Sequence, residues 1–388
     1  MKIALYATPL VTRHITGIEQ LARNIVAQWA AIAPDHQFFI LLENHLPYQR
    51  DFDASVIDFL PENFQIARIH PERRFSTMER IEGLFHRDAA RPGRREPWEI
   101  LHSFSAWLPR SSSVPMVHTI HDLSCELDPR VRRTYEGTRQ RVIHRQAVQR
   151  ASRTIAVSQQ THDDILAIYN VPREHLDIIH NGINPTFTPD TDPRIHRQLV
   201  ELYNLERRYI LMVGSDIPRR NYQHVWLAMQ RVLQSHPRLI LVFAGRNNWT
   251  QTAIYQQIMA SDFLNRVVFI ASPSDQVLAQ LYRDAMLTCC GSSFEGFGLS
   301  VLEAMACGCA VACSDMMSLR ELAGDAVIYF SHDEVDSMTE AISSLADDPE
   351  FRRQLRQRGV QRSAEFTWEH SARQLLKILE NTASLRNR

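Results

Sequence analysis

The sequence predicts an α/β protein in which two Rossmann-like domains are each built around a mostly parallel sheet. Short apolar runs typical of buried strands alternate with longer segments that repeat apolar residues at helical spacing, and this alternation is typical of parallel sheets covered by helices. The pattern begins at residues 3–7 and begins again at residues 209–214. A chain of 388 residues is also long enough for two or three domains.

The first half opens with a strand, a loop and a helix at residues 18–31. The loop lacks the Gly-x-Gly-x-x-Gly pattern, so a dinucleotide cofactor is not indicated. Gly17 heads the helix and would let its N-terminus approach a phosphate or a sugar; a plain turn glycine is the alternative. Ser158 follows a predicted strand and has the residue type of a helix N-cap. Further strands are predicted at residues 37–42, 100–104, 116–122, 154–158 and 177–180.

A proline-containing linker separates the two halves. Asn181-Gly182 is a turn signal, and Pro185, Pro189 and Pro193 follow it, which makes the connection stiff. We therefore place the domain boundary near Pro193. The predicted organisation is a first domain over residues 1–193, a second domain over residues 194–366 and a C-terminal helix over residues 367–388.

The second half opens with a strand, a glycine and a basic loop. Residues 209–214 form the strand, and the loop after it carries Arg219 and Arg220 before a helix begins. This layout suits phosphate binding, because a guanidinium group can donate to two phosphate oxygens at once. Ordinary surface charge is the alternative explanation for these two arginines.

A glycine-rich turn follows a later strand, predicted at residues 286–290. A helix starts after Gly298 and stops at Gly308. The first N–H groups of a helix lack partners within it and favour an anion. Glu295 lies in the turn and Glu303 eight residues later; because carboxylates repel phosphate, these acids better suit neutral hydroxyls or a developing positive charge. An ordinary helix with one capping and one exposed glutamate is the alternative.

The string from Glu295 to Gly308 reads Glu-Gly-Phe-Gly-Leu-x-x-Leu-Glu-Ala-Met-Ala-x-Gly. It resembles the retaining nucleotide-sugar glycosyltransferases of family four, which carry two glutamates at this spacing. The resemblance covers nearly the whole chain, most strongly residues 281–366 and most weakly residues 46–98. It implies the GT-B fold, in which two Rossmann-like domains face a cleft and the C-terminal helix returns to the first domain. The first domain would hold the acceptor and the second the nucleotide sugar.

The resemblance also implies roles for individual residues. Glu303 would bind the ribose hydroxyls, and Glu295 would contact the donor hexose near its C3 and C4 hydroxyls. Two positions depart from the family pattern, because Ser215 stands where the family has an arginine and Arg220 where it has a lysine. The groups that would hold the diphosphate are the side chains of Arg219 and Arg220 and the N–H groups of Gly296, Phe297, Gly298 and Leu299.

His121 ends a predicted strand in the string Thr-Ile-His-Asp-Leu. This string is similar to that of the bacterial mannosyltransferases in the family, where the histidine contacts the donor hexose. A structural histidine is the alternative. In the same family the loop that corresponds to Gly17 faces the donor across the cleft.

We therefore expect a retaining hexosyltransferase that moves mannose from GDP-mannose to a lipid-linked oligosaccharide acceptor. Its product would be a bacterial surface polysaccharide such as the O-antigen of lipopolysaccharide. The alternatives are a UDP-sugar-dependent enzyme and a catalytically inactive nucleotide-sugar-binding subunit of the same fold. The nucleotide sugar is a substrate, and we predict neither a cofactor nor a metal ion.

The composition limits the partners and the location. The formal net charge is -1, which argues against a nucleic-acid partner. Residues 1–7 read as a strand rather than a signal peptide, and no run of 18 apolar residues occurs, so we predict a cytoplasmic protein without a membrane span. Six cysteines, five of them within residues 289–313, are interpreted as buried thiols rather than as a zinc site.

All but two of the 43 basic residues are arginines, and two stretches are rich in them. Residues 68–95 read as irregular surface. Residues 130–153 are predicted to be helical, and their arginines would contact the anionic inner face of the plasma membrane or a lipid-diphosphate acceptor. A solvated helix face is the alternative.

Overall fold

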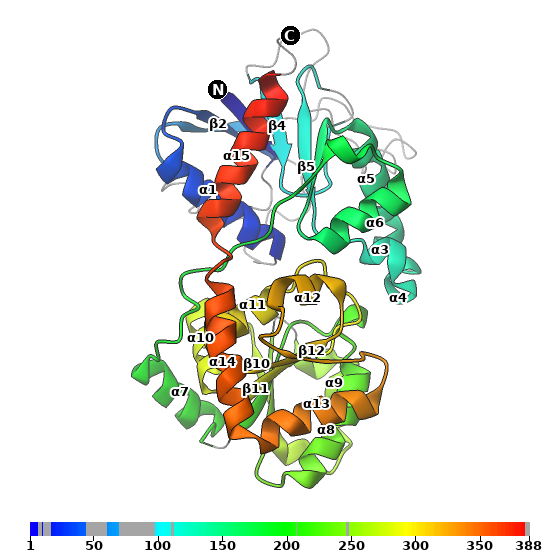
Figure 1. The fold of residues 1–388 in the computed structure, drawn as a ribbon, viewed down its shortest axis with the longest axis vertical. Helices are drawn as coiled ribbons and strands as arrows, with labels where there is room; N and C mark the ends of the chain where they lie inside the picture. The colour runs from blue at the N-terminus through cyan, green and yellow to red at the C-terminus, as the bar shows by residue number, and fades with distance from the viewer. Residues whose placement is uncertain are drawn as a thin grey trace. The chain divides into compact units, whose positions relative to one another are not determined.

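The computed structural model describes residues 1–6, 10, 17–43, 60–69, 98–109, 112–206, 208–245 and 248–384. The chain divides into two units, each with its own sheet (Figure 1). The first unit comprises Met1–Glu126, Thr134–Gly182 and Thr367–Arg388, and the second comprises Leu127–Arg133 and Ile183–Phe366.

The first unit contains a seven-stranded parallel sheet in the order β3-β2-β1-β4-β5-β6-β7. The strands are β1 Lys2–Tyr6, β2 Gln37–Glu43, β3 Phe64–Ile69, β4 Ile100–Ser103, β5 Met116–Ile120, β6 Arg153–Ala156 and β7 Leu176–Ile178. The helices in this part of the chain are α1 Gly17–Ile32, α3 Ser124–Leu127, α4 Pro129–Arg132, α5 Tyr135–Arg150, α6 Gln159–Tyr169 and the short η4 Arg173–His175. The predicted strands are present to within two residues, and β3 is a strand that the sequence analysis did not predict.

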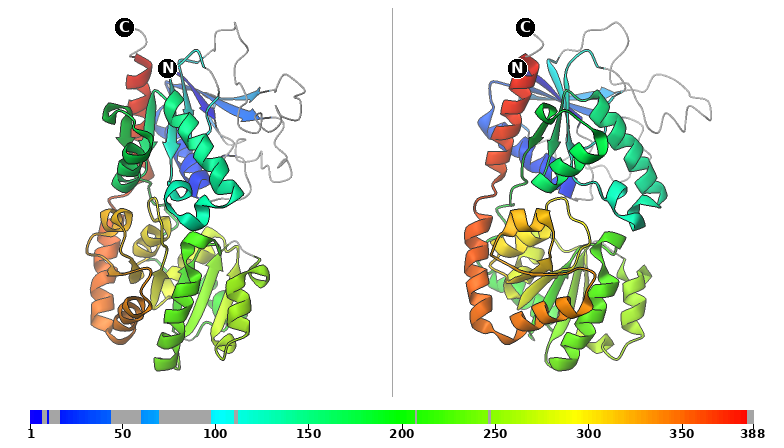
Figure 2. Two further views of the ribbon diagram at one scale, coloured as in Figure 1. Left: turned by 90° about the vertical axis from the view of Figure 1, so that its right-hand side faces the viewer. Right: turned by 45° about the vertical axis from the view of Figure 1, so that its right-hand side comes forward.

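Helices cover both faces of this sheet (Figure 2). Successive side chains of a strand point to opposite faces, so the apolar side chains on both faces need a covering layer. Ile3 and Leu5 of β1 pack in one core with α1 and with the C-terminal helix α15, Trp368–Ser384. Ala4 points to the other face and packs in a core that includes Ile143 and Ala147 of α5.

The C-terminal helix α15 is part of the first unit although it ends the chain. The indole Nε1–H of Trp29 in α1 donates to the carbonyl of Ala372 at 3.0 Å, and the Ser371 hydroxyl donates to the carbonyl of His180 at 2.7 Å. A Cβ on Gly182 would lie 2.2 Å from the backbone nitrogen of Trp368. A side chain at position 182 would clash with Trp368, so glycine at this position lets α15 start beside the end of the segment Thr134–Gly182.

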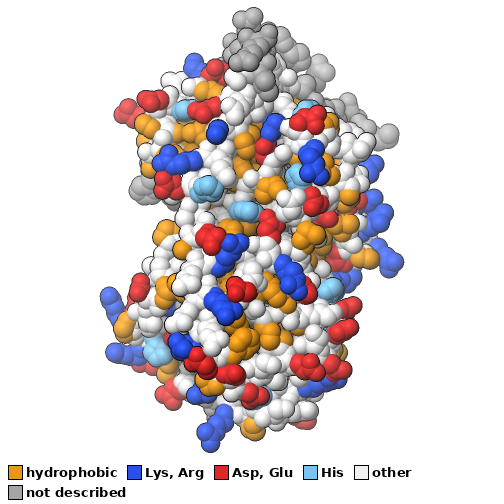
Figure 3. Space-filling model, in the orientation of Figure 1, with side chains coloured by type: hydrophobic (Ala, Val, Ile, Leu, Met, Phe, Trp, Pro, Cys, Tyr) orange, Lys and Arg blue, Asp and Glu red, His pale blue; other side chains and the backbone are white. Residues whose placement is uncertain are grey.

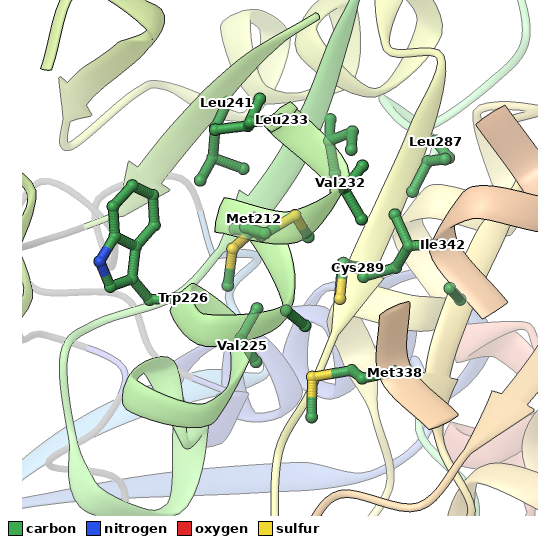
Figure 4. Close-up of a cluster of buried hydrophobic side chains, with 14 of the residues drawn as sticks. Met212, Val225, Trp226, Val232, Leu233, Leu241, Leu287, Cys289, Met338 and Ile342 are labelled. Carbon is green, nitrogen blue, oxygen red and sulfur yellow. The ribbon is translucent and has the colours of Figure 1, made fainter. Parts of the chain in front are cut away.

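The second unit contains a six-stranded parallel sheet in the order β10-β9-β8-β11-β12-β13. The strands are β8 Tyr209–Val213, β9 Ile240–Gly245, β10 Val267–Ala271, β11 Leu287–Cys290, β12 Val311–Ser314 and β13 Ile328–Phe330. The helices are α7 Pro193–Tyr203, α8 Tyr222–Ser235, α9 Ala253–Met259, α10 Asp275–Asp284, α11 Leu299–Ala306, α12 Met317–Ala323, α13 Val335–Asp347 and α14 Pro349–Ser363, with short turns η5 Pro218–Arg220, η6 Trp249–Gln251 and η7 Leu264–Arg266. On one face of the sheet, Met212 packs with Val225 of α8 and Met338 of α13 (Figure 4).

The chain passes between the units at residues 182–183 rather than near Pro193. Arg283 of α10 donates to the carbonyls of Thr186 and Thr188 at 2.9 and 2.7 Å, so the predicted linker is fastened to the second unit. Pro193 is the first residue of α7, where its missing N–H is not needed.

Residues 130–153 do not form one helix, which corrects the prediction. Thr134 is extended, and its side chain accepts from the N–H of Gly137, so a new helix, α5, starts after α4 has ended. Arg153 lies in β6 and pairs with Asp177 at 2.6 Å. Of residues 68–95, which were predicted to be irregular surface, Arg68 and Ile69 end β3 and the others lie outside the described residues.

Several buried or half-buried arginines hold backbone carbonyls at helix ends. Arg266 donates to the carbonyls of Leu233, His236 and Leu239, at and beyond the end of α8. Arg352 does the same at the end of α13, Arg362 at the end of α12 and Arg356 just after α10. These guanidinium groups satisfy carbonyls that have no partner within their helices.

Two further predictions are confirmed. Ser158 is the N-cap of α6, with its side chain accepting from the N–H of Thr161. All six cysteines are buried and free. Among the described helices, none combines the length and the apolar character that crossing a bilayer requires.

Candidate functional site

The candidate site of the second unit lies where its strand order reverses. β9 flanks β8 on one side and β11 flanks it on the other, and ligands of open parallel sheets bind at such a crevice, beyond the carboxyl ends of the strands. The loop after β8 carries Arg219 and Arg220, and the loop after β11 carries Ser292 and Glu295. The fold therefore brings together residues that are more than 70 positions apart in the sequence.

The loop after β8 depends on two glycines. Gly214 has φ +134°, and a Cβ there would lie 2.8 Å from Nε of Arg220. A Cβ on Gly245, at the end of β9, would lie 2.1 Å from the carbonyl oxygen of Gly214. The two strand ends can thus approach each other closely, and the Arg220 side chain lies directly against the backbone of residue 214.

The turn before α11 has the shape that the sequence predicts. Gly298 has φ +103° and is the N-cap of α11, and a Cβ there would lie 2.4 Å from Cδ2 of Leu319. The Ser318 hydroxyl donates to the carbonyl of Glu295 at 2.7 Å. Phe297 is buried and meets the Phe366 ring edge-on at 5.8 Å. The side chain of Phe297 therefore belongs to the core, and only its backbone could face a ligand.

Glu295 lies between the two arginines. Nη1 of Arg220 donates to Oε1 of Glu295 at 2.7 Å, and Nη1 of Arg219 donates to Oε2 at 3.0 Å. The Ser292 hydroxyl, which is buried, donates to the same Oε1 at 2.8 Å. The carboxylate is thus held by three donors from two loops.

Electrostatics keeps this cluster ionised. Burial is the largest influence on Glu295 and would raise its pKa, but the charges of Arg220 and Arg219 and the hydrogen bonds from Ser292 and Arg219 together outweigh it, so the pKa is lowered. For Arg220 burial again opposes the charged form, and the Glu295 carboxylate outweighs it and raises the pKa. The site therefore presents a fixed carboxylate and two fixed cations at neutral pH.

Glu303 lies in the second turn of α11 and is also buried. The phenol of Tyr282 in α10 donates to its Oε2 at 3.3 Å. Burial, followed by the Glu303 charge, raises the pKa of Tyr282 well above its usual value, so the phenol stays protonated and can donate.

The remaining two predicted residues, Gly17 and His121, belong to the first unit. Gly17 is the first residue of α1 and His121 follows β5. A ring nitrogen of His121, Nε2, lies 2.7 Å from the carbonyl oxygen of Phe104 and so carries the proton. Burial lowers the pKa of His121 although the charges of Asp122 and Glu19 oppose this shift. Because Glu19 lies in the first turn of α1, the start of α1 and His121 share one edge of the sheet.

Comparisons with known proteins agree with this arrangement. Residues 15–187 match the family described as Glycosyltransferase Family 4, and residues 198–362 match the Glycosyl transferases group 1 family. The chain belongs to the glycosyltransferases that carry these two domains. The resemblance and the GT-B fold that the sequence analysis predicted are both confirmed.

Individual relatives of this glycosyltransferase match along nearly all of its length. O-antigen chain mannosyltransferase B of Escherichia coli is 26% identical over 97% of this chain and 98% of its own length. Among solved structures, sucrose-phosphate synthase from Thermosynechococcus elongatus superposes with a TM-score of 0.76 at 19% identity, covering 99% of this chain and 100% of that one. Anabaena HepE in complex with UDP-glucose superposes with a TM-score of 0.71 at 17% identity, covering 98% and 100%.

The sequence analysis missed two residues of the candidate site, Ser292 and Tyr282. Each holds one of the two glutamates. A hydroxyl placed two residues after a predicted buried strand was the available signal for Ser292. Arg246 follows β9 in the sequence and would be a candidate replacement for the arginine that the family has at position 215, but it lies outside the described residues.

A group of histidines lies beside His121 in the first unit. His102 and His118 are fully buried, and burial lowers the pKa of each to about 3. Burial also lowers the pKa of His144, to about 4, and charge interactions join this residue to His118 and His121. The His102 ring meets the Phe104 ring edge-on at 4.8 Å. These imidazoles are therefore neutral at physiological pH.

We predict that replacing His102 by Leu makes the glycosyltransferase less sensitive to acid. The pKa of His102 is about 3 in the folded chain and 6.5 in the unfolded chain. Above pH 6.5 the ring is neutral in both states, so it does not make the free energy of unfolding depend on pH. As the pH falls below 6.5, the unfolded chain takes up a proton first and the free energy of unfolding decreases. Between about pH 6.5 and 4.5 the wild-type chain should lose roughly 1.4 kcal/mol per pH unit more than the variant. Urea unfolding at a series of pH values measures this slope, and equal slopes would contradict the assignment.

We also predict that Ser292 positions Glu295. Ser292→Ala should lower kcat about tenfold with little change in KM, because a hydrogen bond to a charged group is worth about 1.5 kcal/mol. Ser292→Thr keeps the hydroxyl and should restore most of the rate. Ser363→Ala is the control, because Ser363 is also buried in the second unit and donates to the carbonyl of Val360. Steady-state kinetics that show the same kcat for Ser292→Ala and the wild type would refute this role.

Proposed function

We propose that this glycosyltransferase moves mannose from GDP-mannose, with retention of configuration, to a lipid-linked glycan in bacterial surface polysaccharide synthesis. The observation that carries the proposal is the cluster of Arg219, Arg220 and Glu295 at the reversal of strand order. Support for the sugar comes from the end-to-end similarity to O-antigen chain mannosyltransferase B. A UDP-sugar donor is the alternative.

The proposed chemistry needs positive charge at the leaving group. When the bond between the anomeric carbon and the phosphate oxygen breaks, negative charge grows on the diphosphate. Arg219, Arg220 and the N–H groups from Gly296 to Leu299 would stabilise that charge. The acceptor hydroxyl would attack the same face of the sugar, and the leaving phosphate oxygen would take its proton. Since two guanidinium groups supply the charge, we propose that no metal ion or cofactor takes part.

The other site residues would bind the donor. Glu303 would accept hydrogen bonds from the ribose hydroxyls, and Glu295 would accept them from the hexose. His121 has Nε2 committed to a carbonyl, so its other nitrogen, Nδ1, would accept from a sugar hydroxyl. Gly17 would leave room for the donor at the start of α1.

We predict that Arg220→Ala and Glu295→Ala each lower the rate of sugar transfer at least about a hundredfold, because each removes stabilisation of a charged or oriented group in the transition state. Incubation with labelled GDP-mannose and a panel of UDP-sugars, with release of nucleoside diphosphate and product as readouts, measures the rate and identifies the donor. The control is Arg320→Ala, which removes an exposed arginine that pairs with Asp315.

Two outcomes of this assay would count against the proposal. An unchanged rate in Glu295→Ala would remove the site assignment. Nucleotide binding without turnover of any donor would instead favour a catalytically inactive binding subunit.

Membrane contact is a separate part of the proposal. Both signs of charge are mixed over the face of the molecule in Figure 3, and ion pairs join Arg139 to Glu136 and Arg141 to Glu126. Within residues 131–150 the exposed basic or apolar groups are Arg132, Arg133, Tyr135, Val142 and Arg145, and exposed polar or acidic residues such as Glu136 and Thr138 lie among them. We assign the contact with the anionic inner face of the plasma membrane to these five basic or apolar residues, with Tyr135, three-quarters exposed, as an interfacial anchor.

We predict that replacing Arg132, Arg133 and Arg145 by Gln weakens binding to phosphatidylglycerol vesicles on the order of a hundredfold, since each basic residue near an anionic surface contributes about 1 kcal/mol. Vesicle co-sedimentation at low salt measures the partition. The matched control replaces Arg231, Arg353 and Arg373, which are more than half exposed elsewhere. Equal loss in both triple variants would mean that net charge, not this surface, governs binding.

A further inference from the structure

The two arginines assigned to the diphosphate are the two that hold Glu295. Each oxygen of the carboxylate accepts from a different guanidinium group, at 2.7 and 3.0 Å. The Glu295 side chain is 8% exposed and those of Arg219 and Arg220 are 22% and 16% exposed. A diphosphate that binds here must therefore share these cations with an anion that is already in contact with them.

Glu295 uses only part of the Arg220 guanidinium group. Nη1 of Arg220 serves Glu295, whereas Nε of the same side chain is buried and finds no hydrogen-bond partner among the described residues. This Nε lies against Gly214, where a Cβ is missing. An anion that binds to the accessible part of this guanidinium group would share one cation with the Glu295 carboxylate, and the two anions would repel each other.

We propose that Glu295 sets the preference of the site between the nucleotide sugar and the nucleoside diphosphate that remains after transfer. The inference rests on the proposed diphosphate contact with Arg219 and Arg220. With the intact donor, the sugar hydroxyls donate to the Glu295 carboxylate and offset its repulsion of the phosphates. Once the sugar has left, the carboxylate faces only phosphate.

The chemistry of the product strengthens this effect. Cleavage of the glycosyl bond turns a phosphate diester into a terminal phosphate, whose second ionisation has a pKa near 6 and which carries about one more negative charge near pH 7. The Glu295 carboxylate therefore repels the product more strongly than it repels the donor, although the arginines also attract the more anionic product more strongly. Glu295 would weaken product binding and so assist its release.

The test compares two ligands on one variant. Isothermal titration with GDP and UDP first identifies the base that the wild type binds, and the diphosphate and its nucleotide sugar are then titrated without acceptor. Glu295→Gln removes the charge and keeps the shape. We expect it to bind the nucleoside diphosphate about tenfold more tightly, the scale of one charge-assisted hydrogen bond, and the nucleotide sugar no more tightly than the wild type does.

Two control variants isolate the cause. Glu303→Gln removes the same charge from the second turn of α11 but should weaken binding of both ligands, because it loses the ribose contact. Asp315→Asn removes an exposed charge that pairs with Arg320 and should change either affinity by less than about twofold. Thermal unfolding of each variant checks the fold, and Glu295→Ala provides a second variant with the same expected direction.

The outcomes separate this inference from the proposed function. If Glu295→Gln and Glu295→Ala bind the nucleoside diphosphate no more tightly than the wild type, the inference is wrong. If Glu303→Gln tightens binding as much as Glu295→Gln, a general charge effect explains the gain and the inference is again wrong. If Arg220→Ala leaves the affinity for nucleoside diphosphate unchanged, the proposed diphosphate site itself is wrong.

Discussion

The carboxylate of Glu295 is bound by guanidinium groups from another strand's loop, and this ion pair fixes the geometry of the second unit's site. Arg219 and Arg220 follow β8, whereas Glu295 follows β11, so the contact joins two loops across the crevice between neighbouring strands. Removal of one partner from a buried ion pair typically costs 3–5 kcal/mol, because the other charge remains uncompensated. The ion pairs therefore hold the two loops together, because separating the loops would leave the charges of Glu295 and of the two arginines without partners.

Glycines at three positions let the backbone around this ion pair pack closely. Cβ atoms on Gly214, Gly245 and Gly298 would each lie within 3.0 Å of another atom, and real Cβ atoms do not approach so closely. The first two glycines let the ends of β8 and β9 meet beneath Arg220, and the third lets α11 start against α12.

Local features of this site could be predicted from the sequence, and non-local ones could not. The turn at Gly298 and the two glutamates lie within one short string, so spacing alone indicated the helix start. The pairing of Glu295 with Arg219 joins residues 76 positions apart, and no local pattern encodes it. The passage at residues 182–183 was misplaced for the same reason, because the contacts of Arg283 with the supposed linker are visible only in three dimensions.

The arginines illustrate how partner atoms decide what a residue type does. A sequence with so many arginines gives no means of telling an anion-binding guanidinium from a structural one. In the structure, Arg266 and Arg352 donate to neutral carbonyls, so these donors are already used by the backbone. Arg219 and Arg220 instead share a carboxylate, which is itself an anion and occupies the kind of position that a phosphate oxygen would use. Arg153 also pairs with a carboxylate, that of Asp177, so a carboxylate partner alone does not identify an anion-binding arginine. Arg219 and Arg220 share Glu295 where the strand order reverses, which supports their proposed role in diphosphate binding, and the same carboxylate would oppose the diphosphate there.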